Sequence, residues 1–338
     1  MRKLKLMAVA LSVLFTIALT YATIELPNAI NDVLKNYIPD IGIWNWSEAK
    51  ALIDQLKPIG YTSFVIVLAL IAIGFLVKRR SLSILGSLVI YMPIFGYFAF
   101  TMFFLAGIGI LRVLWLPLID LAPQALLLGL VVYVPYIIID LCASALLKAL
   151  CGSHYGWALS AFHYYSALAI VIAGLAIFSL GVSTWLYTRF RGLKLAKTFI
   201  YRFSRHPQYL GFLVWSYGML ILSTYVLKAP RGGYVPPPSL LWLISAMAII
   251  GLALMEEVEL AHRDEEYRQY RREVPFMIPL PRPLAKALKA PMTLMLKKEF
   301  PQSRRDVVLT ILLYTAILIA LSALIFLLTP RFPYISLT

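Results

Sequence analysis

The sequence is short of charged residues. Only 14% of its 338 residues are Asp, Glu, Lys or Arg, while 61% are hydrophobic and the mean hydropathy is +0.82. A soluble domain usually carries about a quarter charged residues, because its surface must face water. This composition therefore excludes an ordinary soluble enzyme and predicts an integral, multi-pass membrane protein.

Cysteine and histidine are also scarce. The two cysteines, Cys142 and Cys151, form no CxxC pair, which excludes a disulfide framework, and we expect them to serve packing. The four histidines are His154, His163, His206 and His262. They lack the spacing of HExxH or a similar ligand set, so the sequence predicts no metal site.

Acidic residues are outnumbered, with 16 Asp and Glu against 31 Lys and Arg, for a net charge of +15. In a soluble protein this excess would indicate nucleic acid. In a membrane protein, basic residues collect on the cytoplasmic side and meet anionic headgroups. We therefore expect membrane lipids and no nucleic acid as partners, and the sequence indicates no obligate protein partner.

Eight apolar runs are present, and about 20 such residues cross a membrane as a helix. The runs are Leu6–Ile24, Pro58–Val77, Ser81–Leu111, Leu121–Leu147, Ala149–Thr188, Pro207–Leu227, Gly232–Met255 and Val307–Pro330. The first resembles a secretory signal, since Arg2, Lys3 and Lys5 precede it and residues 20–22 resemble a cleavage site. We favour a retained anchor over cleavage of residues 1–22.

Lys and Arg cluster at residues 78–80, 189–205 and 263–305, which we expect on the cytoplasmic side. An even number of crossings must then separate the first two clusters, so we expect the stretch Ser81–Ile119 to form two helices. This favours nine crossings within a range of seven to nine. The predicted fold is all-α, a polytopic bundle of about eight to nine spans. A C-terminal helical hairpin and an interfacial tail would form its cofactor site.

One acid, Asp140, interrupts a predicted span. An acid inside a membrane helix is by default a candidate functional residue. Because Lys148 lies only eight residues away, we favour an interfacial or paired acid instead.

The most informative segment is Tyr201–Gly211, which reads YRFSRHPQYLG and leads into an uncharged run. Proline is favoured at the first position of a helix, so Pro207 predicts a helix start with Arg205 and His206 at its mouth. Free N–H groups and the helix dipole make such a mouth suitable for an anion. An interfacial anchor that contacts headgroups is the alternative reading.

A pair of adjacent acids, Glu256 and Glu257, ends the run Gly232–Met255. Two carboxylates at the end of a membrane helix are costly unless they serve a cation or a buried partner. The alternative is a helix end that lies in water just beyond the membrane. A tail with Tyr267, Tyr270, Arg271 and a proline-rich stretch follows.

Together these motifs resemble the superfamily of isoprenylcysteine carboxyl methyltransferases and phospholipid methyltransferases. The resemblance runs over residues 173–281 and consists of an Arg-His-Pro-x-Tyr-x-Gly motif, a helical hairpin, a Glu-Glu pair and a Tyr-x-x-Tyr tail. It implies a membrane enzyme that uses S-adenosyl-L-methionine and methylates a lipophilic substrate arriving through the bilayer, with the catalytic site on the cytoplasmic side.

The resemblance also implies site residues. The catalytic candidates are Glu256, Glu257 and Arg271. The cofactor-binding candidates are Tyr201, Arg205, His206, Pro207, Tyr209, Leu210, Gly211, Glu257, Tyr267 and Tyr270. It divides the chain into an N-terminal membrane region of unknown role (1–160), a catalytic core (161–306) and a C-terminal transmembrane helix (307–338).

Departures from the family pattern bear on the substrate. Relatives usually carry glycine two residues before the first tyrosine, where this chain has Phe199. Relatives that methylate carboxyl groups tend to carry an arginine one turn before the Glu pair, where this chain has Leu252 and Ala253. A prenylcysteine carboxylate and an amine-headed lipid therefore both stay open as acceptors.

Two other functions are alternatives, a reductase and a transporter. Membrane sterol reductases share a related Arg-His-Pro-x-Tyr-x-Gly motif but bind NADPH, and the plain Glu pair favours the methyl donor over that reading. A transporter would be expected to show pseudo-symmetry and charged or unwound segments within its spans. Only Asp140 fits that description.

Overall fold

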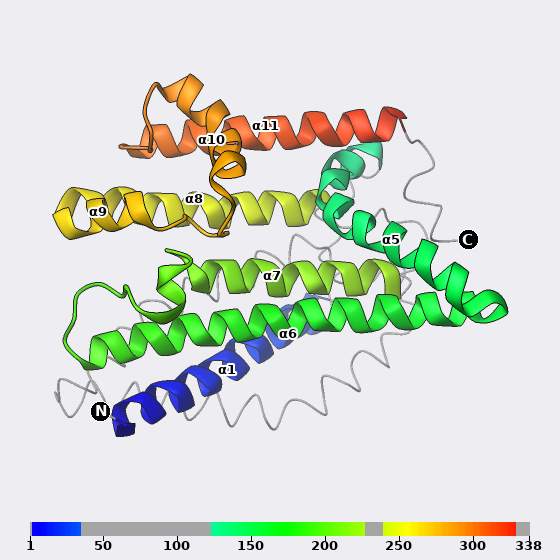
Figure 1. Cartoon of the computed structure of the whole chain (residues 1–338), viewed down its shortest axis with the longest axis horizontal. Helices are drawn as coiled ribbons and strands as arrows, with labels where there is room; N and C mark the ends of the chain where they lie inside the picture. The colour runs from blue at the N-terminus through cyan, green and yellow to red at the C-terminus, as the bar shows by residue number, and fades with distance from the viewer. Residues whose placement is uncertain (1, 35–122, 227–238, 329–338) are drawn as a thin grey trace.

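The computed structural model describes residues 2–34, 123–226 and 239–328, and every regular element in these ranges is a helix (Figure 1). The α-helices are α1 (Arg2–Leu34), α5 (Val134–Cys151), α6 (Tyr155–Phe190), α7 (Pro207–Ile221), α8 (Ser239–Arg263), α9 (Glu265–Glu273), α10 (Arg282–Leu296) and α11 (Arg304–Leu328). Shorter helical segments are η2 (Pro123–Tyr133), η3 (Gly152–His154), η4 (Phe199–Arg202) and the π-helical turn η5 (Leu222–Val226).

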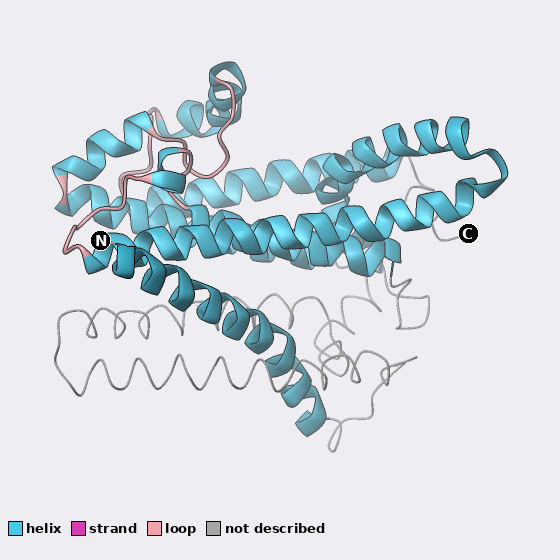
Figure 2. Cartoon of the chain, turned by 60° about the horizontal axis from the view of Figure 1, so that its bottom comes forward, coloured by secondary structure: helices cyan, strands magenta, loops and turns pink. Residues whose placement is uncertain are grey.

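The long helices lie roughly side by side, with α6 and α7 adjacent and α1 against α6 (Figures 1 and 2). Apolar side chains from α1, α6, α7 and α8 form one core, which includes Phe15, Phe178 and Trp215. A second core joins η2 and α5 to the far ends of α6, α7 and α8 and is flanked by α11. This packing places the C-terminal ends of α6 and α8 beside the start of α7, which is where the site lies.

Three segments are long and apolar enough to cross a membrane: Lys3–Tyr21, Leu127–Phe190 and Arg304–Leu328. The second contains α5 and α6, which are separated by the short turn η3. The predicted all-helical membrane fold is confirmed at this coarser level. The runs Pro58–Val77 and Ser81–Leu111 lie outside the described residues, so the count of eight to nine spans stays a prediction.

Most predicted runs coincide with helices, with differences at their ends. The first run was expected to end at Ile24, but α1 continues to Leu34. The run from Leu121 opens with η2, a 3-10 helix of 11 residues, before α5 begins. Apolar composition marks the core of a helix well, but it does not specify where the hydrogen-bond pattern changes.

Glycine allows α6 and α7 to pack closely. A methyl group added at Gly211 of α7 would overlap the backbone of Phe178 in α6, and one at Gly218 would lie 2.7 Å from the Val171 nitrogen. Gly174 of α6 meets the backbone of Trp215 in the same way. Small residues at such a contact let two membrane helices approach each other. Gly211 is therefore a point of close approach between the two helices.

At the far end of α6, Asp140 pairs with a histidine. The His163 Nε2 atom lies 2.7 Å from Asp140 Oδ1, and the two side chains join α5 to α6. Next to this pair, the Tyr136 hydroxyl lies 2.8 Å from Ser166 Oγ. The expectation of a paired acid is confirmed, with His163 rather than Lys148 as its partner.

Candidate functional site

A short segment, helical only at η4, joins α6 to α7 and carries the basic motif. The chain leaves α6 at Phe190, turns at Gly192 with φ of 71°, and forms η4 before α7 begins at Pro207. Pro207 is the first residue of α7, as predicted, and it needs no hydrogen-bond partner because it has no N–H group. This start fixes Arg205 and His206 immediately before the helix.

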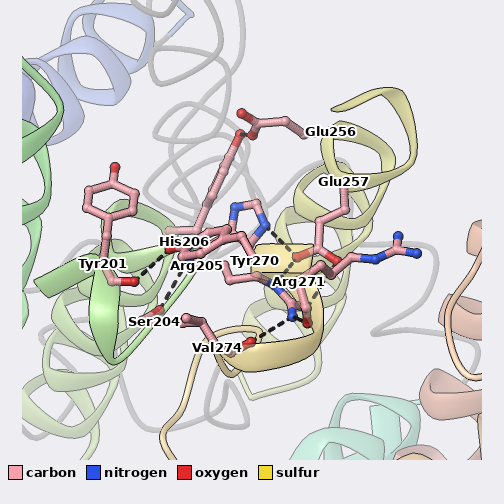
Figure 3. Close-up of polar contacts among 10 residues, drawn as sticks. Tyr201, Ser204, Arg205, His206, Glu256, Glu257, Tyr270, Arg271 and Val274 are labelled. Carbon is pink, nitrogen blue, oxygen red and sulfur yellow. Dashed lines mark hydrogen bonds and ion pairs between the residues drawn. The ribbon is translucent and has the colours of Figure 1, made fainter. Parts of the chain in front are cut away.

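Arg205 and His206 both bind Glu257, which comes from the end of α8 (Figure 3). The Arg205 guanidinium donates to both carboxylate oxygens, with Nε 2.6 Å from Oε1 and Nη2 3.1 Å from Oε2. His206 Nε2 lies 3.1 Å from Oε1. All three side chains are buried. Arginine forms such two-point contacts because its guanidinium is planar, so the pair holds α8 against the start of α7.

The same arginine also holds the segment that follows α9. Arg205 Nη1 donates to the carbonyl of Val274 at 2.7 Å and to that of Arg271, and the Arg205 N–H donates to the Pro275 carbonyl at 3.0 Å. The Tyr270 hydroxyl donates to the Tyr201 carbonyl at 2.6 Å. These bonds connect the loop before α7 to α9, so the predicted motif and the predicted tail form one structure (Figure 3).

The protonation of Glu257 follows from these contacts. Burial by itself raises the pKa of a carboxyl group, but the hydrogen bond from His206 and the charge of Arg205 act in the opposite direction and outweigh it. The pKa of Glu257 is therefore lowered from its ordinary value. The residue is a carboxylate whose charge is already neutralised by its two neighbours.

A cavity of about 130 Å³ lies beside this ion pair. Its walls come from α1, the C-terminal end of α6, the loop before α7, the start of α7, the end of α8, and α9. The lining residues are Phe15, Val182, Trp185, Arg189, Lys194, Leu195, Ala196, Tyr201, Arg205, His206, Gln208, Tyr209, Glu256, Leu260, Tyr267 and Tyr270. Seven residues named from the sequence line this cavity, although they come from η4, the loop before α7, α7, α8 and α9.

The two adjacent glutamates face different surroundings. Glu256 lines the cavity, whereas Glu257 lies behind the wall in its contacts with Arg205 and His206 (Figure 3). The Tyr209 hydroxyl donates to Glu256 Oε2 at 3.2 Å. Among the described residues no ion pair involves Glu256, so its carboxylate is available to a bound group. Successive residues of a helix point about 100° apart, which explains the separation.

Tyr267 contributes a second polar group to the cavity. Its side chain is buried, and its hydroxyl makes no hydrogen bond with any described residue. Burial, and then the negative charge of Glu257, raise the pKa of Tyr267, so the hydroxyl stays protonated. Tyr267 therefore adds a protonated phenol to the cavity wall, close to the buried carboxylate of Glu257.

Besides Glu257, four of the named candidates lie outside the cavity wall. Pro207 starts α7, Leu210 packs against the apolar core, and Gly211 makes the contact between α6 and α7. The Arg271 guanidinium lies over the Phe300 ring, 4.3 Å from its centroid. These positions suit a structural role, whereas Tyr201, Arg205, His206, Tyr209, Tyr267 and Tyr270 touch the cavity directly.

Sequence reasoning did not single out several wall residues. Arg189 and Lys194 bring two positive charges to the cavity, and Trp185 lies beneath Arg189, whose Cζ is 5.5 Å from the ring centroid. Phe15 comes from α1, a helix that was assigned no role. Arg189 and Lys194 belong to an acid-free basic cluster that we used only for orientation. That cluster was the signal available for finding them.

A helical fold with candidate membrane spans, and a cavity near the end of its helices that is lined by side chains of both charge signs, defines a candidate membrane enzyme. The family model described as phospholipid methyltransferase matches residues 156–229. This segment runs from the start of α6 through α7 and contains the Arg-His-Pro motif. The match confirms the resemblance predicted from the motifs, and because the family is one of methyltransferases it supports an enzyme.

The match covers less than a quarter of the chain, and it ends before the Glu pair and the tyrosine-rich tail. No curated protein and no solved structure matches the chain. The roles of Glu256, Glu257, Tyr267 and Tyr270 therefore depend on the geometry described above.

Proposed function

We propose that this protein transfers a methyl group from S-adenosyl-L-methionine to a lipophilic acceptor, with the donor held in the cavity between α6, α7, α8 and α9. The observation that carries the proposal is the cavity itself. Its wall combines the cations Arg189 and Lys194, the carboxylate of Glu256 and aromatic faces, and part of this wall belongs to the segment that the family model matches.

The wall residues suit the groups of the donor, which has a carboxylate, an ammonium, a ribose, an adenine and a sulfonium. Arg189 and Lys194 would hold the carboxylate, because Arg205 is already committed to Glu257. Glu256 would hold the ammonium group, and the Tyr267 hydroxyl would donate to the ribose or adenine. Tyr209 and Trp185 offer faces that stabilise a cation by about 0.5–2 kcal/mol.

When bound, S-adenosyl-L-methionine supplies a methyl group on a positively charged sulfur. Methyl transfer is an in-line displacement, so the protein contributes mainly alignment and a cavity with little water. Glu257 and Arg205 would act as positioning residues that hold His206 and the cavity wall. Pro207, Leu210 and Gly211 would set the start and position of α7, and Arg271 would act through Phe300 and its backbone carbonyl.

The acceptor determines whether a base is needed. An amine must lose a proton, and Glu256 is the carboxylate placed to accept it, since Glu257 is paired. A carboxylate acceptor needs no base. We favour an amine-headed lipid over a prenylcysteine because no arginine stands one turn before the Glu pair.

We place the catalytic core at residues 161–306 and the cavity on the cytoplasmic side, since the basic residues at 189–205 and 263–305 surround it. Residues 307–338 would form a C-terminal transmembrane helix. Phe15 contributes to the cavity wall, so the region 1–160 would also support the site.

The proposal is tested by calorimetric titration of the purified protein with S-adenosylhomocysteine. We expect the parent to bind, and we expect Arg189→Gln and Glu256→Gln each to weaken binding at least tenfold. Arg191→Gln is the matched control, because this exposed neighbour of Arg189 does not line the cavity. Binding of NADPH instead, or equal affinity in all three variants, would overturn the proposal.

Incubation with labelled donor and a total lipid extract then identifies the acceptor. Label on an amine-headed lipid supports the preferred acceptor, whereas label on a prenylated peptide would replace it. If Glu256 is the base, Glu256→Gln should lower kcat at saturating donor and shift the pH profile.

A further inference from the structure

Helix α10 presents two opposite faces of different chemistry. Arg282, Lys286 and Lys289 recur at intervals of four and three residues, so they lie along one side of the helix. Leu284, Leu288 and Met295 lie along the other side, and each is exposed, the first two by about half of their surface. The helix contains no acidic residue. An exposed apolar face opposite a purely basic one is the pattern of helices that lie in a membrane surface.

The orientation of α10 agrees with that pattern. In Figure 1, α10 runs across α11 rather than along it, and Met292 is the side chain that is buried. The Tyr314 hydroxyl of α11 donates to the Leu288 carbonyl. Tyr314 lies seven residues beyond Val307, where the uncharged part of α11 begins, which corresponds to about 10 Å along the helix. Amphipathic helices bind at about this depth, near the boundary of headgroups and acyl chains.

The cationic side of α10 contacts an aromatic ring. Lys289 Nζ lies over the Phe300 ring, 4.8 Å from its centroid. Among the described residues no ion pair involves Arg282, Lys286 or Lys289, and all three are exposed. Positive charges without acidic partners beside an apolar face match a surface of hydrocarbon and negatively charged headgroups. An aqueous position would leave the leucine face in water.

We propose that α10 lies in the plane of the membrane at the face that carries the cavity. Its leucine face enters the hydrocarbon, and Arg282, Lys286 and Lys289 bind the headgroups of anionic lipids. Because residues 274–281 connect α10 directly to α9, this contact also fixes a wall of the cavity at the membrane surface. The proposal is independent of the reaction that the cavity supports.

The test uses the full chain in nanodiscs, with Cys142 and Cys151 replaced by serine. Single cysteines are introduced by Leu284→Cys, Leu288→Cys and Lys286→Cys, and each carries a nitroxide label. All three sites are exposed, so the substitutions leave the packing intact. We expect labels at 284 and 288 to be relaxed by oxygen, which concentrates in hydrocarbon. The label at 286 should respond several-fold more to a water-soluble nickel reagent.

Lipid charge supplies the second readout. We expect the label at 284 to lie deeper in discs that contain phosphatidylserine than in discs of phosphatidylcholine alone. Arg282→Gln, Lys286→Gln and Lys289→Gln together should abolish that difference. A control that removes the same charge from α8 and α9, Arg263→Gln, Arg268→Gln and Arg272→Gln, should retain it.

Three results would overturn the proposal. Labels at 284 and 288 that respond to the nickel reagent place the helix in water. Labels shielded from both reagents place it against protein, as in a second copy of this chain. Equal depth in neutral and anionic discs removes the role of the headgroups.

Discussion

At the scale of single residues, the Arg205 and Glu257 pair organises the candidate site. Both side chains are almost fully buried, and Arg205 also makes three backbone contacts with residues 271–275. A buried charge that loses its partner is much more costly than the pair is favourable. The pair therefore matters more for holding the motif and the tail together than for net stability.

We expect Glu257→Gln and Arg205→Lys each to destabilise the protein by about 3–5 kcal/mol. Glu257→Gln leaves the buried charge of Arg205 without its partner. Arg205→Lys loses the two-point contact with the Glu257 carboxylate. Thermal unfolding in detergent measures this effect. Replacing both residues by apolar ones, Arg205→Met with Glu257→Leu, should restore much of the stability but not the binding of S-adenosylhomocysteine. If the double variant binds as the parent does, the pair has no part in shaping the cavity.

Phe199 occupies a position where the backbone is unfavourable for it. Its φ is 53°, in the left-handed region that favours glycine, and its side chain is 61% exposed. Relatives in the superfamily that the motifs resemble usually carry glycine there. The backbone at this position therefore has a conformation that glycine adopts more easily than phenylalanine.

We expect Phe199→Gly to stabilise the protein by about 1 kcal/mol, because it relieves the left-handed strain and loses little packing. Phe203→Gly is the control, since Phe203 is similarly exposed but has a φ of −105°. That change should be neutral or destabilising in the same thermal unfolding measurement. A loss of stability in Phe199→Gly would show that the phenyl ring has a packing role.

At the scale of elements, the contact between α6 and α7 positions the site. Glycines remove side chains where the two backbones meet, so the start of α7 is held against the C-terminal half of α6. That half carries Trp185 and Arg189 to the cavity.

A methyl group at Gly211 would collide with the α6 backbone, which cannot move without shifting the whole helix. We expect Gly211→Ala to destabilise the protein by about 1–3 kcal/mol and to weaken donor binding. Gly156→Ala serves as the control, because open space surrounds Gly156 at the start of α6. It should leave unfolding unchanged or raise the melting temperature slightly. Equal effects of the two changes would argue against a tight contact.

At the scale of the whole molecule, the length of α6 sets the two ends of the protein apart. Its 36 residues span about 54 Å, which exceeds the hydrocarbon thickness of about 30 Å. The cavity lies at one end of α6, and the Asp140 and His163 pair lies towards the other. The two polar regions therefore belong to different membrane faces if α6 spans the bilayer.

We expect single cysteines made by Arg191→Cys and Ser153→Cys to lie on opposite sides of the membrane. In a background without Cys142 and Cys151, an impermeant maleimide added to sealed vesicles should label only one of them. The orientation of the vesicles then shows whether the cavity faces the cytoplasm. Labelling of both sites before the vesicles are opened would contradict a single crossing by α6.

The sequence by itself determined the class of the protein and the local starts of its elements. Apolar runs predict helices because a membrane requires internally bonded backbone, and Pro207 predicts a helix start because proline is favoured at the first helical position. The order and spacing of the motifs were sufficient to indicate a methyltransferase family, and the family model that matches residues 156–229 agrees.

Only the tertiary structure decided which charged groups meet. The sequence placed Arg205 at an anion site and named Glu257, not Glu256, as the cofactor-binding glutamate, but the packed helices turn Glu257 onto Arg205 and leave Glu256 in the cavity. They also bring Arg189, Lys194 and Phe15 to the wall. Spacing along one chain cannot supply this result, because it depends on the rotation and depth of several helices that lie far apart in the sequence.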